Sequence, residues 1–195
     1  MNLPNKLTVM RMILIPFVMF FYLASFIPYG IGKIVALVIF VVAALTDLLD
    51  GKIARKYNLV TNLGKFLDPI ADKILTSSVL FMLMADGTIP APWGVIVVSI
   101  IIAREFMVSA LRLLAASKGI VLAADIWGKS KTMVQMIAIP VCMLIPFVIE
   151  IAAASWLVLT IQIVGWVLIG VATILTIVSG ANYLIKNKDC FKESK

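Results

Sequence analysis

The chain has 195 residues, of which 63% are apolar and only 14% are charged. A soluble domain has about 45–50% apolar and about 25% charged residues, so the composition excludes an ordinary soluble protein and predicts an all-α integral membrane protein. The net charge is +7. Lys and Arg gather on one side of the predicted helices, which explains this charge without a nucleic-acid partner.

Six apolar segments are long enough to cross a bilayer, which takes about 20 residues. They lie at residues 8–27, 31–54, 67–85, 92–116, 130–149 and 154–185. Pro-Tyr-Gly at 28–30 and Pro-Ala-Pro at 90–92 are turn signals between neighbouring segments. No polar insert is long enough to fold separately, so we expect a single membrane domain over residues 1–195.

The N-terminal stretch and the two cysteines give no evidence for a signal peptide or for disulfide bonds. Arg11 interrupts the first apolar run and no small-residue cleavage site follows it, so we do not expect a cleaved signal peptide. Cys142 lies in an apolar run and Cys190 in a lysine-rich tail. This pair predicts no disulfide framework.

The distribution of Lys and Arg predicts the orientation. Most of the 17 basic residues lie in residues 6–11, 52–65, 112–131 and 186–195. If the six segments cross the membrane in turn, these four stretches lie on the same side of it, and Lys33 lies on the opposite side. Cytoplasmic loops carry the excess of positive charge. Both termini and the stretch from Asp47 to Asp72 are therefore expected to face the cytoplasm.

Four carboxylates stand out in this otherwise apolar chain: Asp47, Asp50, Asp68 and Asp72. The first two are three residues apart and the last two are four apart, so each pair shares one helix face, with members about 5–6 Å apart. Repulsion among four such charges is costly in a low-dielectric setting. The pattern therefore predicts two divalent cations held by carboxylate oxygens.

The residues around these carboxylates predict their local setting. Asp68-Pro69 is typical of a helix start, with Asp68 as a capping candidate, and Gly64 is expected to form a tight turn before it. Capping does not explain Asp72, one turn further on. Gly51 and Ala54 are small residues on nearly the same face as Asp50. Another helix or a ligand can therefore approach the backbone closely there.

A second polar group is basic and comes from later segments: Arg104, Arg112, Lys129 and Lys131. Arg104 lies about two turns before Arg112, roughly 12 Å along a helix, which is deep for a simple anchor. An arginine at that depth needs an anionic partner. Glu105 offsets part of this charge, and we expect the group to bind the phosphate of a substrate.

The carboxylates and their neighbours follow the pattern Asp47-x2-Asp50-Gly51-x2-Ala54-Arg55-x8-Gly64-x3-Asp68-x3-Asp72. This pattern resembles the signature of the CDP-alcohol phosphotransferase family of integral membrane enzymes, without a departure. Residues 4–11, 66–69, 103–106 and 128–132 look like the flanking motifs of bacterial members that use sn-glycerol 3-phosphate. The resemblance thus extends across most of the chain.

The resemblance implies a homodimer with six transmembrane helices in the bacterial cell membrane. It implies transfer of a phosphatidyl group from CDP-diacylglycerol to sn-glycerol 3-phosphate with release of CMP. Two Mg²⁺ or Mn²⁺ ions would be held by Asp47, Asp50 and Asp68 and by Asp47, Asp68 and Asp72, with Asp72 as the proton acceptor. The implied nucleotide contacts are Asn5, Thr8, Asp47, Gly51, Ala54, Arg55, Thr61 and Gly64.

Two other readings stay open at the level of sequence. A related enzyme with another acceptor, such as inositol phosphate, would carry the same carboxylates. A cation-coupled transporter would also gather carboxylates in a membrane, but it predicts charges near the midplane and internal symmetry, and the chain shows neither pattern. The basic cluster favours an acceptor that carries a phosphate.

Overall fold

The computed structural model describes residues 2–24, 26–27, 30–56, 61–117, 126–151 and 154–187, with side chains except at 3, 4, 48–56, 62, 63, 65, 66 and 117. These residues form six helices and no strand: α1 (Leu3–Leu23), α2 (Ile31–Lys56), α3 (Asn62–Ala85), α4 (Trp93–Ser117), α5 (Ile126–Ile151) and α6 (Ser155–Lys186). Each predicted apolar segment coincides with one helix. The all-α prediction is therefore confirmed for the described part of the chain.

Four helices of the described chain have the length and apolar composition of a membrane span. These are α1 over Asn5–Leu23, α4 over Trp93–Ala116, and α5 and α6 over their whole length. Helix α3 carries Asp68, Asp72 and Lys73, and the side chains at the end of α2 lie outside the described residues. The expected number of six spans therefore stays a prediction.

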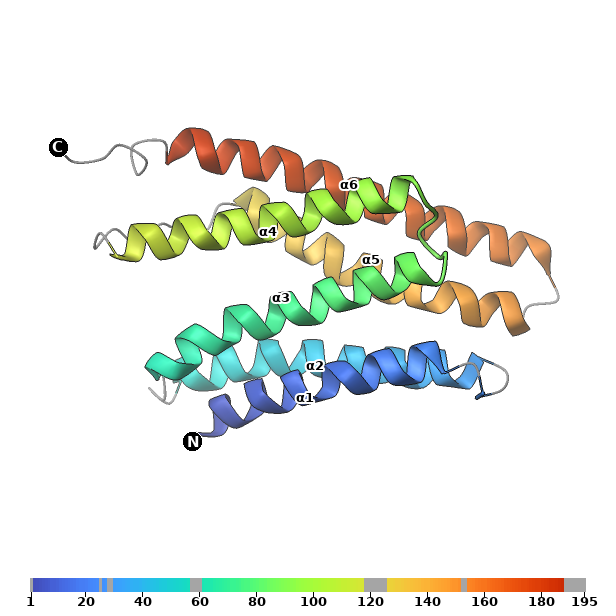
Figure 1. The fold of residues 1–195 in the computed structure, drawn as a ribbon, viewed down its shortest axis with the longest axis horizontal. Helices are drawn as coiled ribbons and strands as arrows, with labels where there is room; N and C mark the ends of the chain where they lie inside the picture. The colour runs from blue at the N-terminus through green and yellow to red at the C-terminus, as the bar shows by residue number, and fades with distance from the viewer. Residues whose placement is uncertain are drawn as a thin grey trace.

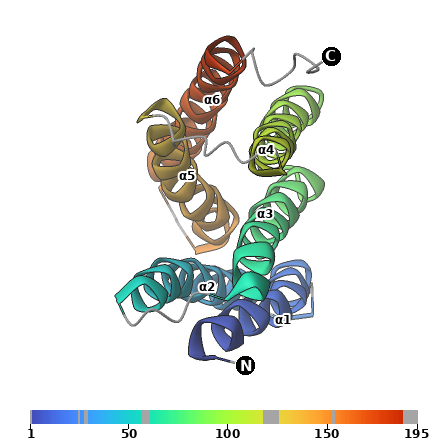
Figure 2. The same ribbon diagram turned by 90° about the vertical axis from the view of Figure 1, so that its left-hand side faces the viewer.

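The helices lie side by side along the longest axis of the molecule (Figure 1). Helix α1 packs on α2 and α3, helix α6 packs on α4 and α5, and α2 also contacts α5. Viewed from one end, α3 lies between the α1–α2 pair and the group of α4, α5 and α6 (Figure 2). The start of α1, the end of α2, the start of α3 and the ends of α4 and α6 all lie at one end of the molecule (Figure 1).

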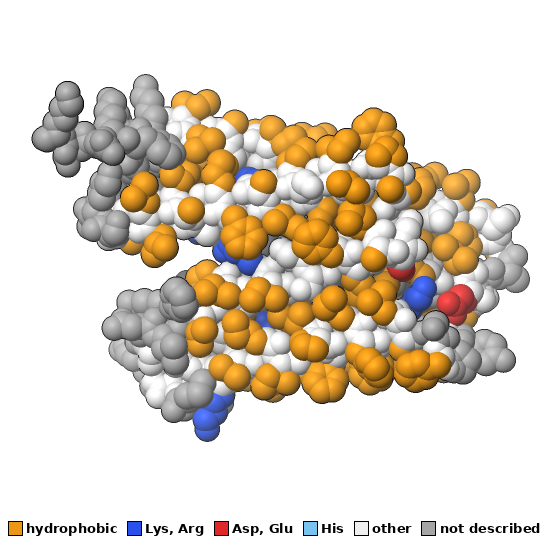
Figure 3. All heavy atoms as spheres, viewed as in Figure 1, with side chains coloured by type: hydrophobic (Ala, Val, Ile, Leu, Met, Phe, Trp, Pro, Cys, Tyr) orange, Lys and Arg blue, Asp and Glu red, His pale blue; other side chains and the backbone are white. Residues whose placement is uncertain are grey.

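The interior and the outer faces are both apolar. Fully buried side chains from five helices form one core, with Val18, Phe40, Leu75, Leu83, Ile101, Ile139 and Met143 among them. Large apolar side chains also cover the outside (Figure 3), including Phe17, Phe20, Trp156 and Ile174, each about half exposed or more. Apolar residues around the whole circumference of a helix are typical of a helix in lipid.

The start of α3 differs from the prediction. The helix begins at Asn62, with Thr61 as the N-cap: the Thr61 hydroxyl accepts a hydrogen bond from the Gly64 backbone N–H. Asp68 and Pro69 lie inside the helix, and Gly64 lies in its first turn. The prediction of a helix start at Asp68 and of a turn at Gly64 is therefore wrong, because Thr61 caps the helix almost two turns earlier.

Candidate active site

Polar residues of α1 meet the start of α3. The Thr61 hydroxyl donates to Asn5 Oδ1 over 2.9 Å and accepts from the Gly64 N–H over 3.0 Å. Asn5 and Thr8 are buried. A Cβ on residue 64 would lie 2.7 Å from Asn5 Oδ1, so only glycine lets α1 approach α3 this closely. The structure thus brings together four of the predicted nucleotide contacts.

Helix α1 also supplies partners for two of the four carboxylates. Arg11 is fully buried, and its Nη1 donates to Asp47 Oδ1 on α2 over 2.6 Å. Thr8 donates from its hydroxyl to Asp68 Oδ1 on α3. The side chain of Asp47 keeps 34% of its surface exposed, so an ion or a substrate can still reach it. The contact between Arg11 and Asp47 was not predicted from the sequence, where Arg11 was counted among the basic residues of the cytoplasmic side and in the motif at residues 4–11.

Asp72 lies in a different environment. No described residue donates a hydrogen bond to the Asp72 carboxylate. The Thr76 hydroxyl donates to the backbone carbonyl of Asp72 over 3.0 Å, not to its side chain. Asp47 and Glu105 repel this carboxylate, whereas Lys73 and Arg11 attract it. Asp72 is therefore the carboxylate of α3 whose oxygen atoms remain open to a ligand.

The metal prediction is neither confirmed nor contradicted. Within the described side chains, no three Asp, Glu, Cys or His residues lie close enough together to hold an ion. The side chains of Asp50, Ala54 and Arg55 lie outside the described residues, as do the surroundings of Gly51. The chemistry of Asp47, Asp68 and Asp72 nevertheless fits Mg²⁺ or Mn²⁺, because these ions take oxygen ligands and all three residues offer carboxylates.

A cavity of about 460 Å³ lies between α3, α4 and α5 and is lined in part by basic side chains. Its polar lining consists of Asp72, Lys73, Arg104, Glu105, Ser109, Arg112, Lys129 and Thr132. Lys and Arg side chains gather at the hollow between the two groups of helices in Figure 3. Three of the four predicted phosphate-binding residues therefore share one cavity with Asp72.

Helix α6 orients the two arginines of this cavity. Arg104 Nη2 donates to Ser179 Oγ over 2.7 Å. Arg112 Nε donates to the Tyr183 hydroxyl over 3.4 Å, and its guanidinium lies 5.7 Å from the centre of the Tyr183 ring. Tyr183 is a neutral partner, which leaves the charge of Arg112 available to an anion, whereas Arg104 also faces the Glu105 carboxylate.

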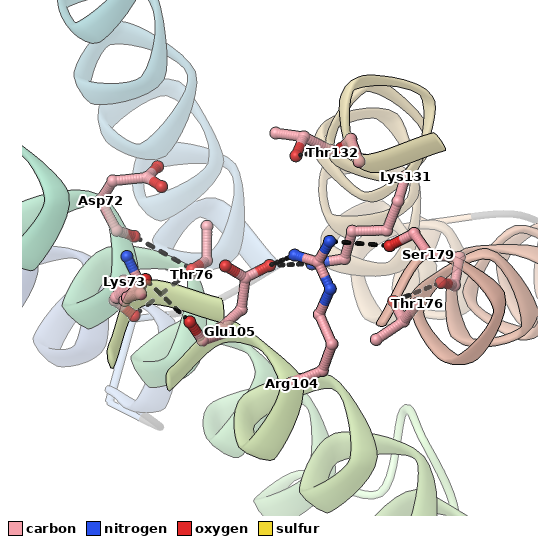
Figure 4. A network of polar contacts seen from close by, with 12 residues as sticks. Asp72, Lys73, Thr76, Arg104, Glu105, Lys131, Thr132, Thr176 and Ser179 are labelled. Carbon is pink, nitrogen blue, oxygen red and sulfur yellow. Dashed lines mark hydrogen bonds and ion pairs between the residues drawn. The ribbon is translucent and has the colours of Figure 1, made fainter. Parts of the chain in front are cut away.

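Lys131 differs from the other three basic residues. It is only 1% exposed, and its ammonium donates to Glu105 Oε1. The same oxygen lies 3.7 Å from Arg104 Nη1. Figure 4 shows Glu105 between Lys131 on one side and Asp72 on the other. Glu105, which the sequence analysis treated as a simple offset, is therefore the centre of the polar network.

Comparison with known proteins agrees with this arrangement. The sequence pattern of the CDP-alcohol phosphatidyltransferase family matches residues 1–178. The chain belongs to this family. A Bacillus subtilis protein named CDP-diacylglycerol–glycerol-3-phosphate 3-phosphatidyltransferase is 42% identical, over 99% of this chain and 98% of its own length.

Relatives in other bacteria have corresponding names. A Rickettsia bellii protein with the same name as the Bacillus subtilis one is 36% identical over 97% of both chains. A Mycobacterium tuberculosis protein named probable phosphatidylglycerophosphate synthase is 37% identical over 95% of this chain and 81% of its own length. This CDP-alcohol phosphatidyltransferase is thus similar over nearly its full length to proteins whose names contain glycerol 3-phosphate or phosphatidylglycerophosphate.

Proposed function

We propose that this protein transfers the phosphatidyl group of CDP-diacylglycerol to sn-glycerol 3-phosphate and releases CMP, the first step from CDP-diacylglycerol toward phosphatidylglycerol. The observation that carries the proposal is the position of Asp72. It lies one helical turn after Asp68, which accepts from Thr8, and it also lines the cavity that contains Arg104, Arg112 and Lys129. A carboxylate between a nucleotide site and a phosphate site suits the transfer of a group from one substrate to the other.

The nucleotide part of CDP-diacylglycerol binds where α1, α2 and α3 meet. Asn5, Thr61 and Gly64 are joined by hydrogen bonds there, and the buried Thr8 donates to Asp68 beside them. We assign the same role to Asp47, Gly51, Ala54 and Arg55 from the family pattern. The apolar outer faces of the helices leave the acyl chains in the lipid, so the substrate needs no deep tunnel.

Asp47, Asp50, Asp68 and Asp72 would hold two divalent ions. When bound, such ions neutralise charge on the pyrophosphate and on the departing CMP. The residues of the chain prepare this arrangement: Arg11 and Thr8 hold Asp47 and Asp68 in place. Asp72 is left free to accept the proton of the acceptor hydroxyl, which is the role of a general base.

The acceptor's phosphate binds in the basic cavity. Arg104 and Arg112 are oriented by Ser179 and Tyr183, and Lys129 lines the same space. Charge-assisted hydrogen bonds to phosphate are about twice as strong as neutral ones. Lys131 supports this site indirectly, because its ion pair with Glu105 balances a carboxylate that would otherwise repel the phosphate.

The remaining features of the proposal concern the whole molecule. The chain forms one domain with six transmembrane helices, and both termini and the active site face the cytoplasm of a bacterial cell. The clustering of Lys and Arg at one side supports this orientation. A homodimer is expected from the family, with no nucleic-acid partner.

The proposal is tested by identifying the lipid product. Purified protein is incubated in mixed micelles with CDP-diacylglycerol, Mg²⁺ and an equal mixture of sn-glycerol 3-phosphate, inositol phosphate, serine and glycerol. Mass spectrometry should detect phosphatidylglycerophosphate and an equal amount of CMP. A phosphatidylinositol phosphate product would identify another acceptor, and no CMP release with any alcohol would refute the enzymatic assignment.

A further inference from the structure

Gln135 has a buried oxygen without a partner. The residue lies on α5, one turn after Lys131, and is only 4% exposed. Its Oε1 atom is buried and has no hydrogen-bond partner in the described structure. Buried carbonyl oxygens are almost always hydrogen-bonded, because an unpaired one loses its interaction with water and gains nothing in return. An orphaned oxygen at this position therefore points to a donor that the protein itself does not supply.

A small cavity of about 30 Å³ adjoins Gln135. It is lined by Asp72, Thr76, Glu105, Lys131, Thr132 and Gln135. This volume fits one hydroxyl group or one water molecule. It does not fit a ring.

Most polar groups around the small cavity already have partners. The hydroxyl of Thr76 donates to the backbone of Asp72, and the hydroxyl of Thr132 donates to the Gly128 carbonyl over 3.0 Å. Lys131 is paired with Glu105. Of the acceptors that line the small cavity, Gln135 Oε1 is the buried one without any hydrogen-bond partner in the described structure.

The small cavity and the basic cavity share Asp72, Glu105 and Thr132. If the phosphate of the acceptor lies among the arginines and its reacting hydroxyl lies at Asp72, the carbon next to the reacting one lies close to the small cavity, because Asp72 lines both cavities. In sn-glycerol 3-phosphate this neighbouring carbon carries the secondary hydroxyl. A hydroxyl is the group that both the volume and the orphaned oxygen would accept.

We propose that Gln135 accepts a hydrogen bond from the secondary hydroxyl of the acceptor and thereby selects a vicinal diol phosphate over a simple alcohol phosphate. The inference rests on the proposed function, because it assumes that the acceptor's phosphate occupies the basic cavity. Gln135 takes no part in proton transfer in this scheme. It determines specificity, and Asp72 remains the base.

The test compares two acceptors that differ only in this hydroxyl: sn-glycerol 3-phosphate and 3-hydroxypropyl phosphate, the monophosphate of propane-1,3-diol. The kcat/KM for each is measured with the wild-type protein and with Gln135→Met, which keeps the length of the side chain and removes its oxygen. Gln162→Met serves as a matched control, because Gln162 lines a separate cavity with Lys33 and Asp86. The ratio of the two kcat/KM values cancels any general loss of folded protein.

We expect the wild-type protein to prefer sn-glycerol 3-phosphate by about tenfold or more, and Gln135→Met to reduce this preference to about twofold or less. The control should keep the wild-type ratio. An unchanged ratio in Gln135→Met would overturn the inference. If the ratio were unchanged because both kcat/KM values fell equally, the result would indicate a bound water or a packing role. If the wild-type protein transferred to neither phosphate, the proposed function itself would fail.

Discussion

The structure makes a sharp prediction at Gly64, where α1 and α3 approach each other. In Gly64→Ala the new Cβ would lie 2.7 Å from Asn5 Oδ1, whereas ordinary contact begins at 3.4 Å. The Asn5 amide must therefore retreat by roughly 0.7 Å to restore normal contact. Asn5 is buried and short, so this movement lengthens the 2.9 Å hydrogen bond from Thr61.

The energy of this change is the balance of three effects. Overpacking a buried contact costs about 1–3 kcal/mol, and the weakened hydrogen bond costs about 0.5–1.5 kcal/mol. Alanine gains up to about 1 kcal/mol over glycine in a helix, and less in the first turn. We therefore expect the free energy of unfolding of Gly64→Ala to fall by about 1–3 kcal/mol.

The functional effect should be specific to one substrate. Displacement of Asn5 should raise the KM for CDP-diacylglycerol by about tenfold, which corresponds to about 1.4 kcal/mol, and leave the KM for sn-glycerol 3-phosphate nearly unchanged. Gly170→Ala on α6 is the matched control, because no atom lies within 4 Å of its new Cβ. Steady-state kinetics and unfolding in detergent measure both quantities. Wild-type KM and stability in Gly64→Ala would refute the close contact.

Four further predictions concern the carboxylates and the basic cavity. Chelation of divalent ions should abolish CMP release and Mg²⁺ or Mn²⁺ should restore it, whereas full activity after verified metal removal would contradict a metal site. Asp72→Asn should keep nucleotide affinity but lose about 10²–10⁴-fold in kcat; turnover near the wild-type rate would assign the base elsewhere. Arg112→Gln should raise the KM for sn-glycerol 3-phosphate about tenfold or more, with Lys33→Gln at the far end as an unaffected control. A double-mutant cycle with Arg11→Met and Asp47→Asn should give a coupling energy of about 1.5–3 kcal/mol for unfolding; additive effects would rule out the ion pair.

The sequence was sufficient to predict the helices, whereas the roles of the site residues stay predictions. Long apolar segments are local features, and each expected segment overlaps the observed helix within a few residues. The exception is α3, where the Asp68-Pro69 signal outweighed Thr61 in the prediction. Proline is tolerated in the interior of this helix, so its presence was weak evidence for a boundary.

Contacts between helices were beyond the reach of sequence reasoning. Arg11 was predicted to belong to the basic residues of the cytoplasmic side, but packing of α1 against α2 buries it beside Asp47. Lys131 was predicted to bind the phosphate directly, but on α5 it faces inward to Glu105, whereas Lys129 is exposed on the larger cavity. Two residues on one helix differ in role because helix rotation, which periodicity alone does not fix, decides which of them faces the interior.

The pairing of Lys131 with Glu105 also explains how a cluster of basic side chains is tolerated between apolar helices. Unpaired charges in such a setting are costly, whereas a paired and hydrogen-bonded set is tolerated. Glu105 neutralises Lys131 and faces Arg104, so the site is assembled before any substrate arrives. The positive charge of Arg112 and Lys129 is not used by this pair. Under the proposed function, the phosphate of the acceptor would therefore meet a cavity whose charges are already paired and oriented, with its reacting hydroxyl near Asp72.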